Sequence, residues 1–153
     1  MQPTSPLFSP FRLGTADLHR FQSLIQLFNR VFEAPFPEIA SDTRLQALLN
    51  KPGFAVYVVC EEEEVVGGAT AYELPLYTSD RGELFVYDMA VKPEYQHQGV
   101  GKALIDALKQ HATDQDLSHL FVPAHASDTG ALAFYRACGG EAEQVVHFNF
   151  PIA

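Results

Sequence analysis

Three consecutive segments rich in β-branched and aromatic residues occupy the middle of the chain, and they limit what it can fold into. They cover residues 54–60, 65–72 and 83–91, and each has the composition of a strand. Four glutamates at 61–64 separate the first two segments and predict a solvated hairpin tip, remote from any chemistry. Three such strands in succession require a sheet at the centre of the molecule, with other elements covering its faces.

Helical periodicity surrounds this block on both sides. Apolar residues recur at steps of three or four over residues 18–32 and 45–49, before the strands. The same spacing returns at 99–111 and 128–138, and the expected N-cap residues are Thr15, Ser41 or Asp42, and Asp128. Short strands are expected at 11–13, 119–123 and 143–150. The order β-α-α-β-β-β-α-β-α-β predicts an α/β fold, a mixed sheet covered by helices, in one domain over residues 1–153 with a loose lead at 1–9.

Charge and composition exclude several classes of function. Ten Lys and Arg against 19 Asp and Glu give a net charge of -9, which argues against a nucleic-acid interface. The sequence has no run of 18 apolar residues, which a membrane span would need, and its start has no signal-peptide pattern. We therefore expect a cytoplasmic protein. The two cysteines and six histidines form no metal-ligand motif, so we expect no metal. An acidic protein suits a cationic small molecule, although four of the acids lie in the hairpin tip.

A glycine-containing junction follows the third strand segment and opens the next helix. Gln98-Gly99-Val100-Gly101-Lys102 places glycines where backbone N–H groups have no intrahelical partner and the helix dipole is positive. This arrangement predicts binding of a phosphate or diphosphate. Gln96 stands where a P-loop needs its first glycine, and Leu104 stands where a dinucleotide fingerprint needs its third. Both of those nucleotide motifs are therefore rejected.

Two motifs together resemble those of a known family. Gln96-x-x-Gly99-x-Gly101, after a strand ending in Met89-Ala90-Val91, resembles the acetyl-CoA signature of the GNAT N-acetyltransferase superfamily. Asp128-x-x-Ala131-x-x-Phe134-Tyr135 is similar to the family's later helix, with Asp in place of Asn. The segment at 85–91, with neighbouring motifs, is similar to the aminoglycoside 3-N-acetyltransferases of that superfamily. The resemblance covers roughly residues 10 to 150.

The resemblance implies acetyl-CoA as co-substrate and a direct attack by an amine on its thioester. The Met89 N–H is expected to donate to the thioester oxygen, and the strand edge at residues 89–91 is expected to pair with the pantetheine arm. The backbone at 98–102 is expected to bind the diphosphate. The residues expected to bind the co-substrate are Met89, Ala90, Val91, Gln96, His97, Gln98, Gly99, Val100, Gly101, Lys102, Asp128, Phe134 and Tyr135.

The resemblance also implies a general acid, while the base stays open between candidates. Tyr135 matches the tyrosine that protonates the departing CoA sulfur in the family. Asp88 interrupts an otherwise apolar strand, where an unpaired carboxylate is costly, so it has either a partner or a function. Glu83, at the start of the same strand, is the other candidate for base or ammonium anchor, and His125, in the loop before the last helix, is an alternative base.

Three functions remain open at this point. The first is acetylation of a small cationic amine, with an aminoglycoside-like molecule as the leading substrate class and drug resistance as one consequence. The second is acetylation of a protein or peptide amine, and the third is CoA binding without catalysis. A homodimer formed through sheet edges is also compatible with the apolar segment at 145–150.

Overall fold

A computed structural model describes residues 7–153 of the chain. It forms two compact units, Met1–Pro123 and Ala124–Ala153. The first unit holds β1 (Phe11–Arg12), α1 (Leu18–Val31), α2 (Asp42–Leu49), β2 (Phe54–Glu61), β3 (Glu64–Leu74), β4 (Glu83–Val91), the short 3-10 helix η1 (Pro93–Tyr95), α3 (Val100–Asp114) and β5 (Leu120–Phe121). The second unit holds α4 (Thr129–Ala137). The α/β class is confirmed, and residues 1–6 of the expected N-terminal lead lie outside the described part.

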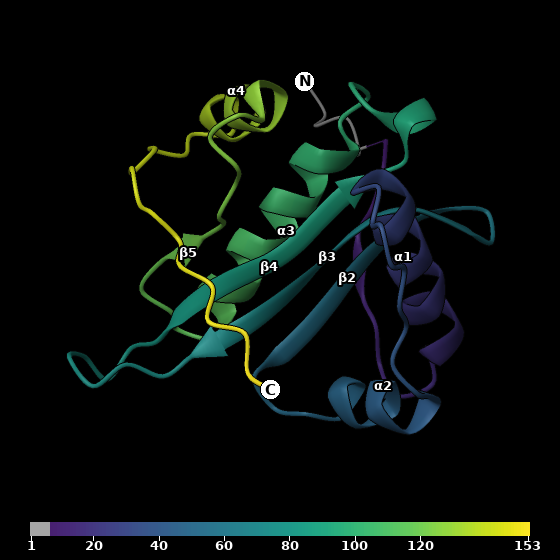
Figure 1. Cartoon of the computed structure of the whole chain (residues 1–153), viewed down its shortest axis with the longest axis horizontal. Coiled ribbons are helices and arrows are strands. Elements are labelled where there is room, and N and C mark those ends of the chain that lie inside the picture. Colours follow the sequence, from purple (N-terminus) through teal and green to yellow (C-terminus); the bar gives the residue numbers. More distant parts are fainter. Residues whose placement is uncertain (1–6) are drawn as a thin grey trace, which may run out of the picture. The chain divides into compact units, whose positions relative to one another are not determined.

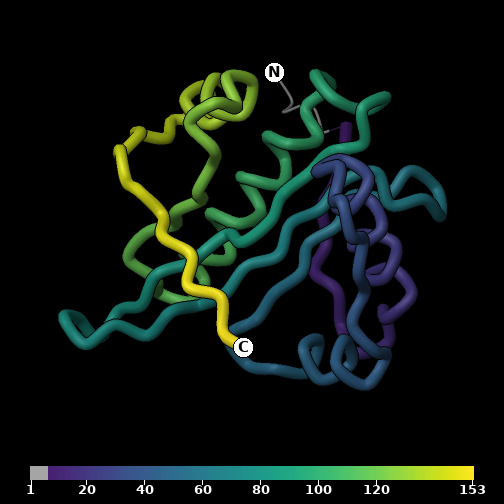
Figure 2. The backbone as a smooth tube through the Cα atoms, viewed as in Figure 1, coloured from purple at the N-terminus to yellow at the C-terminus, as the bar shows by residue number. Residues whose placement is uncertain are grey.

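The sheet of the first unit has the strand order β1-β2-β3-β4-β5 (Figure 1). Its first four strands are antiparallel, and β5 joins β4 in parallel. The glutamates at 61–64 form the exposed tip of the β2–β3 hairpin, as predicted (Figure 2). The long strand β4 has the predicted bounds.

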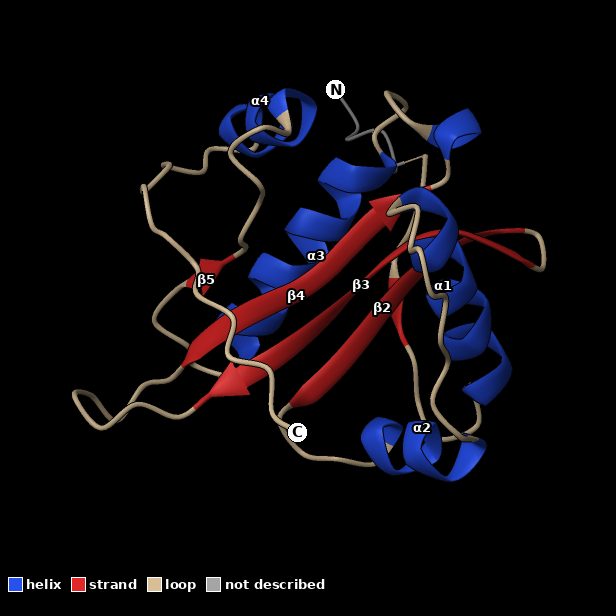
Figure 3. Cartoon of the chain, viewed as in Figure 1, coloured by secondary structure: helices blue, strands red, loops and turns tan. Residues whose placement is uncertain are grey.

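Helices of the first unit cover both faces of its sheet (Figure 3). The apolar stripe of α1, which includes Phe21 and Leu24, packs with α2 against the face that carries Phe54 and Val56. The stripe of α3 packs against the opposite face, where Leu84 and Val86 contact Leu108. Burial of one stripe from each helix encloses the sheet between two apolar layers.

The helix starts match two of the three predicted caps. Ser41 accepts a hydrogen bond from the Arg44 N–H at the start of α2, and Asp128 accepts one from the Ala131 N–H at the start of α4. Thr15 is not the cap of α1, because the helix begins two residues later than it would require. Asp17 occupies the N-cap position, where its carboxylate binds the Gly14 N–H and the Arg20 side chain instead of the helix amides.

The strand expected at 143–150 is wrong. After α4 the second unit is irregular, and residues 143–150 have no partner strand in the described chain. The side chains of Val145, Val146, Phe148 and Phe150 are 73 to 82% exposed. Strand-like composition reports how side chains fit a pleated surface, but a strand forms only where a partner accepts its backbone hydrogen bonds.

The described end of the N-terminal lead is anchored. Phe8 is buried with Val59, Val66 and Leu104, and its ring meets that of Tyr95 edge to face at 6.5 Å. A large apolar side chain gains free energy from this burial, so residue 8 is held against the α3 side of the sheet.

Candidate functional site

Strand β4 has an open edge. Its partner β5 pairs only with Leu84 and Phe85, while on the other side β3 pairs with β4 as far as Val91. In the described chain, residues 86–91 therefore have no strand beside them on the β5 side. Such an edge presents unpaired backbone donors and acceptors that an extended ligand can bind.

The register shows which amides lie on that edge. The Lys92 N–H donates to the Val66 carbonyl on β3 at 2.8 Å. Hydrogen-bonded positions alternate along an antiparallel pair, so residues 90 and 88 also bond to β3. Met89 and Val91 therefore direct their backbone groups to the open edge. The Gln96 side chain already binds one of them, donating to the Val91 carbonyl at 3.1 Å.

A β-bulge divides β4 near its middle. Val86 pairs with Ala71 and Asp88 pairs with Thr70, so Tyr87 is an extra residue on β4. Before the bulge, Leu84 and Val86 face α3, whereas after it Met89 faces α3 and Ala90 faces α1. The bulge therefore moves Asp88 away from the α3 core and onto the face that α1 partly covers. Bulges often redirect a side chain next to an active site.

The Asp88 carboxylate has no ionic compensation. It is half-buried, and no residue of the described chain donates a hydrogen bond to it or forms an ion pair with it. Burial raises the pKa of Asp88 above its ordinary value, because desolvation disfavours the charged form. A carboxyl group of raised pKa is a stronger base when ionised, which suits proton transfer. Of the two alternatives left open for Asp88, a structural partner or a function, the described chain supplies no partner.

The start of α3 provides an anion-binding backbone. Gly99 is the N-cap residue with φ of 92°, no side chain caps the helix, and the space where a Cβ would lie is empty to 4 Å. The first amides of a helix lack intrahelical partners, and the dipole adds positive potential there. The site is therefore accessible to a phosphate at the residues that the sequence indicated.

The side chains around this junction interact mainly with the protein itself. Gln98 donates to the Glu94 carbonyl, and Lys102 forms an ion pair with Asp106 at 2.7 Å. His97 is exposed and has φ of 61°. Backbone amides, rather than these side chains, are thus the principal groups for binding an anion here.

Glu83 lies at the other end of β4. Its carboxylate is 3.4 Å from Nε2 of His119. It pairs with Leu74 on β3, whereas Asp88 pairs with Thr70, so the two residues are about 13 Å apart along the sheet. The structure therefore does not bring Glu83 and Asp88 together, and Glu83 is a poor candidate for a base at the Met89 amide.

The second unit carries the remaining predicted residues. Asp128 caps α4, and Phe134 and Tyr135 lie in its last turns with ring centroids 5.2 Å apart. Burial raises the pKa of Tyr135 to about 12, and the nearby Asp128 and Cys138 add to the shift. Tyr135 therefore keeps its proton at neutral pH. His125 is exposed in the preceding turn, where its carbonyl accepts from the Asp128 N–H.

A polar network fastens α3 to the sheet. The buried His111 joins Tyr57 Oη to its Nδ1 at 2.9 Å and Glu73 Oε1 to its Nε2 at 2.7 Å. The sequence reading missed this network because its members lie on three separate elements. Both ring nitrogens are satisfied, which is the condition for a buried polar group to stabilise a fold.

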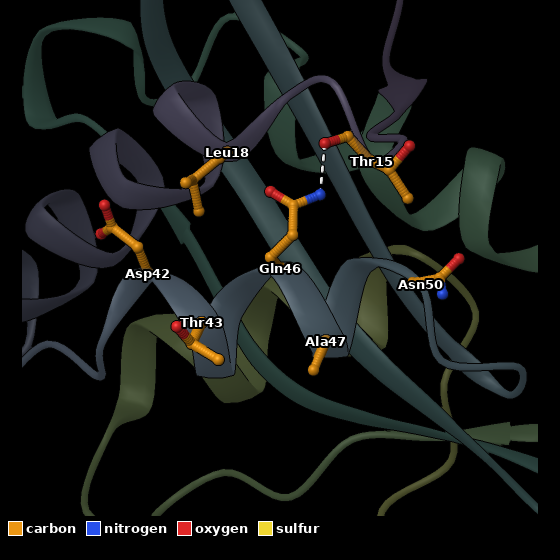
Figure 4. A pocket seen from close by; sticks show the side chains of 7 residues that line it. All are labelled: Thr15, Leu18, Asp42, Thr43, Gln46, Ala47 and Asn50. Carbon is orange, nitrogen blue, oxygen red and sulfur yellow. Dashed lines mark hydrogen bonds between the residues drawn. The ribbon is translucent and has the colours of Figure 1, made fainter.

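A cavity of about 600 Å³ lies in the first unit between the start of α1 and α2 (Figure 4). Gln46 extends across it and donates to the Thr15 carbonyl. Its lining residues are Thr15, Leu18, Asp42, Thr43, Gln46, Ala47 and Asn50. None of them belongs to β4, so the cavity is separate from the strand edge described above.

The bulge at Tyr87 is the feature of the site that sequence reading missed. In the structure, the apolar residues that face α3 change from even positions, Leu84 and Val86, to odd positions, Met89 and Val91, but the sequence hides this change because apolar residues fill both sets of positions. A change of parity inside a strand indicates one extra residue.

Within residues 7–153, no group of three His, Cys, Asp or Glu side chains could hold a metal ion, and no helix is long and apolar enough to cross a membrane.

Comparison with known proteins identifies the family. The model described as "Acetyltransferase (GNAT) family" matches residues 21–139. The chain is 32% identical over 112 residues to the aminoglycoside N(6')-acetyltransferase type 1 of Stenotrophomonas maltophilia, covering 70% of this chain and 72% of that protein. It is 32% identical over 73 residues to the [ribosomal protein bS18]-alanine N-acetyltransferase of Escherichia coli, which is 48% of each chain.

Solved structures extend the match to almost the whole chain. The chain is 40% identical to the aminoglycoside acetyltransferase meta-AAC0020 from an uncultured soil metagenomic sample, and the structure of that protein in complex with trehalose matches with a TM-score of 0.93. Its complex with sisomicin is 39% identical, with a TM-score of 0.92. Both comparisons cover 95% of this chain and 97% of the other. The family match spans more than half of the sequence, and the chain therefore belongs to the GNAT family of N-acetyltransferases.

Proposed function

We propose that this protein transfers an acetyl group from acetyl-CoA to a primary amine of a cationic amino sugar of the aminoglycoside type. The observation that carries the proposal is the middle of β4, where an open strand edge and the uncompensated Asp88 carboxylate lie side by side in sequence. Two similar proteins are named aminoglycoside acetyltransferases, which supports this acceptor class. A cytoplasmic location, a homodimer and a role in drug resistance stay predictions.

The position of the acetylated amine is a separate part of the proposal. The sequence indicated a 3-N enzyme, but the 3-N specificity is not confirmed. The similar enzyme of Stenotrophomonas maltophilia is named for the 6' amine. We therefore take the 6' amine as the first position to test, and the product's regiochemistry can be read directly by NMR.

The first unit fits the co-substrate at two places. The amides of Gly99, Val100 and Gly101 would hold the diphosphate at the start of α3, where the absent Cβ of Gly99 leaves room for it. The open edge of β4 at Met89 and Val91 would hold the extended amide-containing arm. Acetyl-CoA supplies the activated acetyl group as a thioester.

Met89 is the proposed stabiliser of developing negative charge. Its amide lies on the open edge of β4, while its side chain packs on the α3 side. An N–H held rigidly by a sheet needs no reorganisation to donate to an oxyanion. A donor of this type contributes about 3 kcal/mol to lowering a barrier.

Asp88 is the proposed base, acting directly or through a water molecule. The amine must lose a proton to attack, and the raised pKa of Asp88 increases its affinity for that proton. The ionised carboxylate also attracts the ammonium form of the acceptor before reaction. Glu83, about 13 Å from Asp88 along the sheet, is too distant to be the base and would serve as a second anchor for ammonium groups.

Tyr135 is the proposed donor to the departing sulfur. Its pKa of about 12 keeps the phenol protonated across the neutral range. Since an ordinary thiol has a pKa of about 8.5, that phenol releases its proton less readily than a thiol does. The role that suits it is therefore hydrogen-bond donation to the sulfur as charge develops there, with little net proton release.

A thiol-release assay with acetyl-CoA tests the proposal. The acceptor panel contains sisomicin, a linear polyamine, free lysine and a peptide with an N-terminal alanine. We expect release of CoA with sisomicin and a mass gain of one acetyl group on it. Turnover with the peptide alone would instead support the protein-directed alternative, which the partial match to the Escherichia coli enzyme favours. Tight CoA binding without turnover on any amine would support a CoA-binding module.

A further inference from the structure

Four aromatic residues lie on one cross-strand row of the sheet. Phe54 on β2 pairs with Tyr72 on β3, Tyr72 pairs with Phe85 on β4, and Phe85 pairs with Phe121 on β5. We call these four residues the aromatic rung. Phe54 and Tyr72 have ring centroids 4.9 Å apart, and the Phe85 and Phe121 rings are stacked at 4.9 Å.

Tyr87 joins the two halves of the rung. Its ring centroid is 6.0 Å from that of Tyr72 and 5.7 Å from that of Phe85, with edge-to-face geometry in both cases. The bulge that redirects Asp88 is centred on this residue. The result is a continuous aromatic surface across four strands, next to the open edge of β4.

This surface faces away from α3 and is only partly covered within its unit. Leu84, Val86 and Leu120 pack on the α3 side, so their neighbours Phe85 and Phe121 face the other way. Phe54 is buried beneath Phe21 of α1, whereas the other three members of the rung are only partly buried. Tyr87 is 60% exposed. Such exposure of large rings beside a strand edge marks a binding surface more often than a core.

Carboxylates lie beside the partly exposed end of the rung, while the Arg12 side chain donates to the Phe54 carbonyl at its buried end. Glu83 and Asp88 flank Phe85 on β4, one before it and one beyond the bulge. Strands β2, β3, β4 and β5 contain no Lys or Arg. Carboxylates attract an ammonium, and a desolvated ring face attracts it further through its quadrupole. A neutral ligand could use the rings but would gain nothing from the carboxylates, and an anionic ligand would be repelled by them.

We propose that the rung and Tyr87 are the acceptor platform, on which an amino sugar of two or more rings stacks while its ammonium groups reach Asp88 and Glu83. This inference rests on the function proposed above. Sugar rings present flat faces of C–H groups that pack on aromatic rings, and a linear polyamine presents no such face. Along the sheet, the backbone positions of Glu83 and Asp88 are about 13 Å apart, which exceeds one sugar ring and favours a multi-ring acceptor.

Calorimetry with three probes separates ring stacking from charge. Sisomicin has cationic rings, spermine has charge without rings, and trehalose has rings without charge. Tyr87→Leu is expected to raise the dissociation constant for sisomicin about tenfold, because a good aromatic contact contributes about a tenfold factor in affinity. The dissociation constant for spermine should change less than twofold. Tyr87→Phe keeps the ring and should retain most of the affinity. Trehalose should bind the wild type more weakly than sisomicin.

Two further variants keep the test decisive. Tyr77→Leu removes a fully exposed ring from the loop before β4 and should leave sisomicin binding unchanged. Phe121→Leu removes the outermost ring of the rung and should weaken sisomicin binding, as Tyr87→Leu does. Melting temperatures establish that each variant is folded.

The platform is overturned by any of three results. They are wild-type affinity for sisomicin in Tyr87→Leu, an equal loss for sisomicin and spermine, or no sisomicin binding by the wild type. Binding that depends on Tyr87 without any CoA release would leave the platform standing and refute the proposed acetyl transfer. The two proposals therefore fail in distinguishable ways.

Discussion

Replacing Asp88 with Asn should make the protein a much poorer enzyme and a more stable fold. The substitution keeps the shape of the side chain and removes its charge and its ability to take a proton. If Asp88 is the base, kcat/KM falls by about 100- to 10,000-fold, the usual contribution of general base catalysis. That range corresponds to about 3 to 5 kcal/mol of transition-state stabilisation. Sisomicin binding should also weaken, because the buried charge would be lost.

The stability change follows from the direction of the pKa shift. Burial raises the pKa of Asp88 from its ordinary value of 3.8. The folded state then binds the proton more tightly than the unfolded chain, so stability falls as pH rises through the folded pKa. Asn escapes that loss, so Asp88→Asn should be the more stable protein at pH 7. The difference should vanish below pH 3.8, where the unfolded-state aspartate is itself protonated.

Two measurements check this prediction together. Urea unfolding at pH 7 and near pH 3.5 gives the difference in stability, and the pH dependence of kcat/KM gives the activity. The wild type should lose kcat/KM as pH falls through the raised pKa of Asp88, and the variant should lack that limb. Asp80→Asn, in the exposed loop before β4, removes the same charge elsewhere and should change neither. A variant of reduced stability with an unchanged pH profile would refute the reasoning, since Asp88 would then be a structural group.

Three other substitutions, the first with a control variant, test separate parts of the structure. Gly99→Ala forces alanine into φ of 92° at the diphosphate site, so CoA affinity measured by calorimetry should fall at least tenfold. The control Gly139→Ala, with φ of 93° and equally open space, should lower stability by a similar amount, about 1 kcal/mol, and leave CoA affinity unchanged. Tyr57→Phe removes the hydrogen-bond partner of His111 Nδ1 and should lower the free energy of unfolding by about 1 to 3 kcal/mol in urea titrations; an unchanged free energy would contradict a stabilising network. Tyr135→Phe should reduce kcat with little change in CoA affinity, and an equal loss of both would indicate a packing role instead.

Much of the first unit could be predicted from local sequence. The strand β4 has the predicted bounds, and the glycines at 99 and 101 stand at a helix start as expected, because both signals depend on a few adjacent residues. Ser41, and Asp128 in the second unit, cap their helices for the same reason. These features needed no knowledge of tertiary partners.

The features that sequence could not supply all depend on partners distant in the chain. Residues 143–150 have strand composition but no partner, and the Tyr57, His111 and Glu73 network joins three elements. The aromatic rung is visible only once the register of β2 to β5 is known. Asp88 is an intermediate case. The sequence shows a carboxylate inside an apolar strand, but the bulge that redirects it is visible only from its pairing with Thr70.

Amide hydrogen exchange with and without CoA tests the central claim most directly. If the co-substrate lies along the open edge of β4 and at the start of α3, exchange should slow at Met89, at Val91 and over residues 99–101. The amides of Ala90 and Asp88, which already bond to β3, should change little. Protection confined to the cavity between α1 and α2, or no protection at β4, would contradict the account.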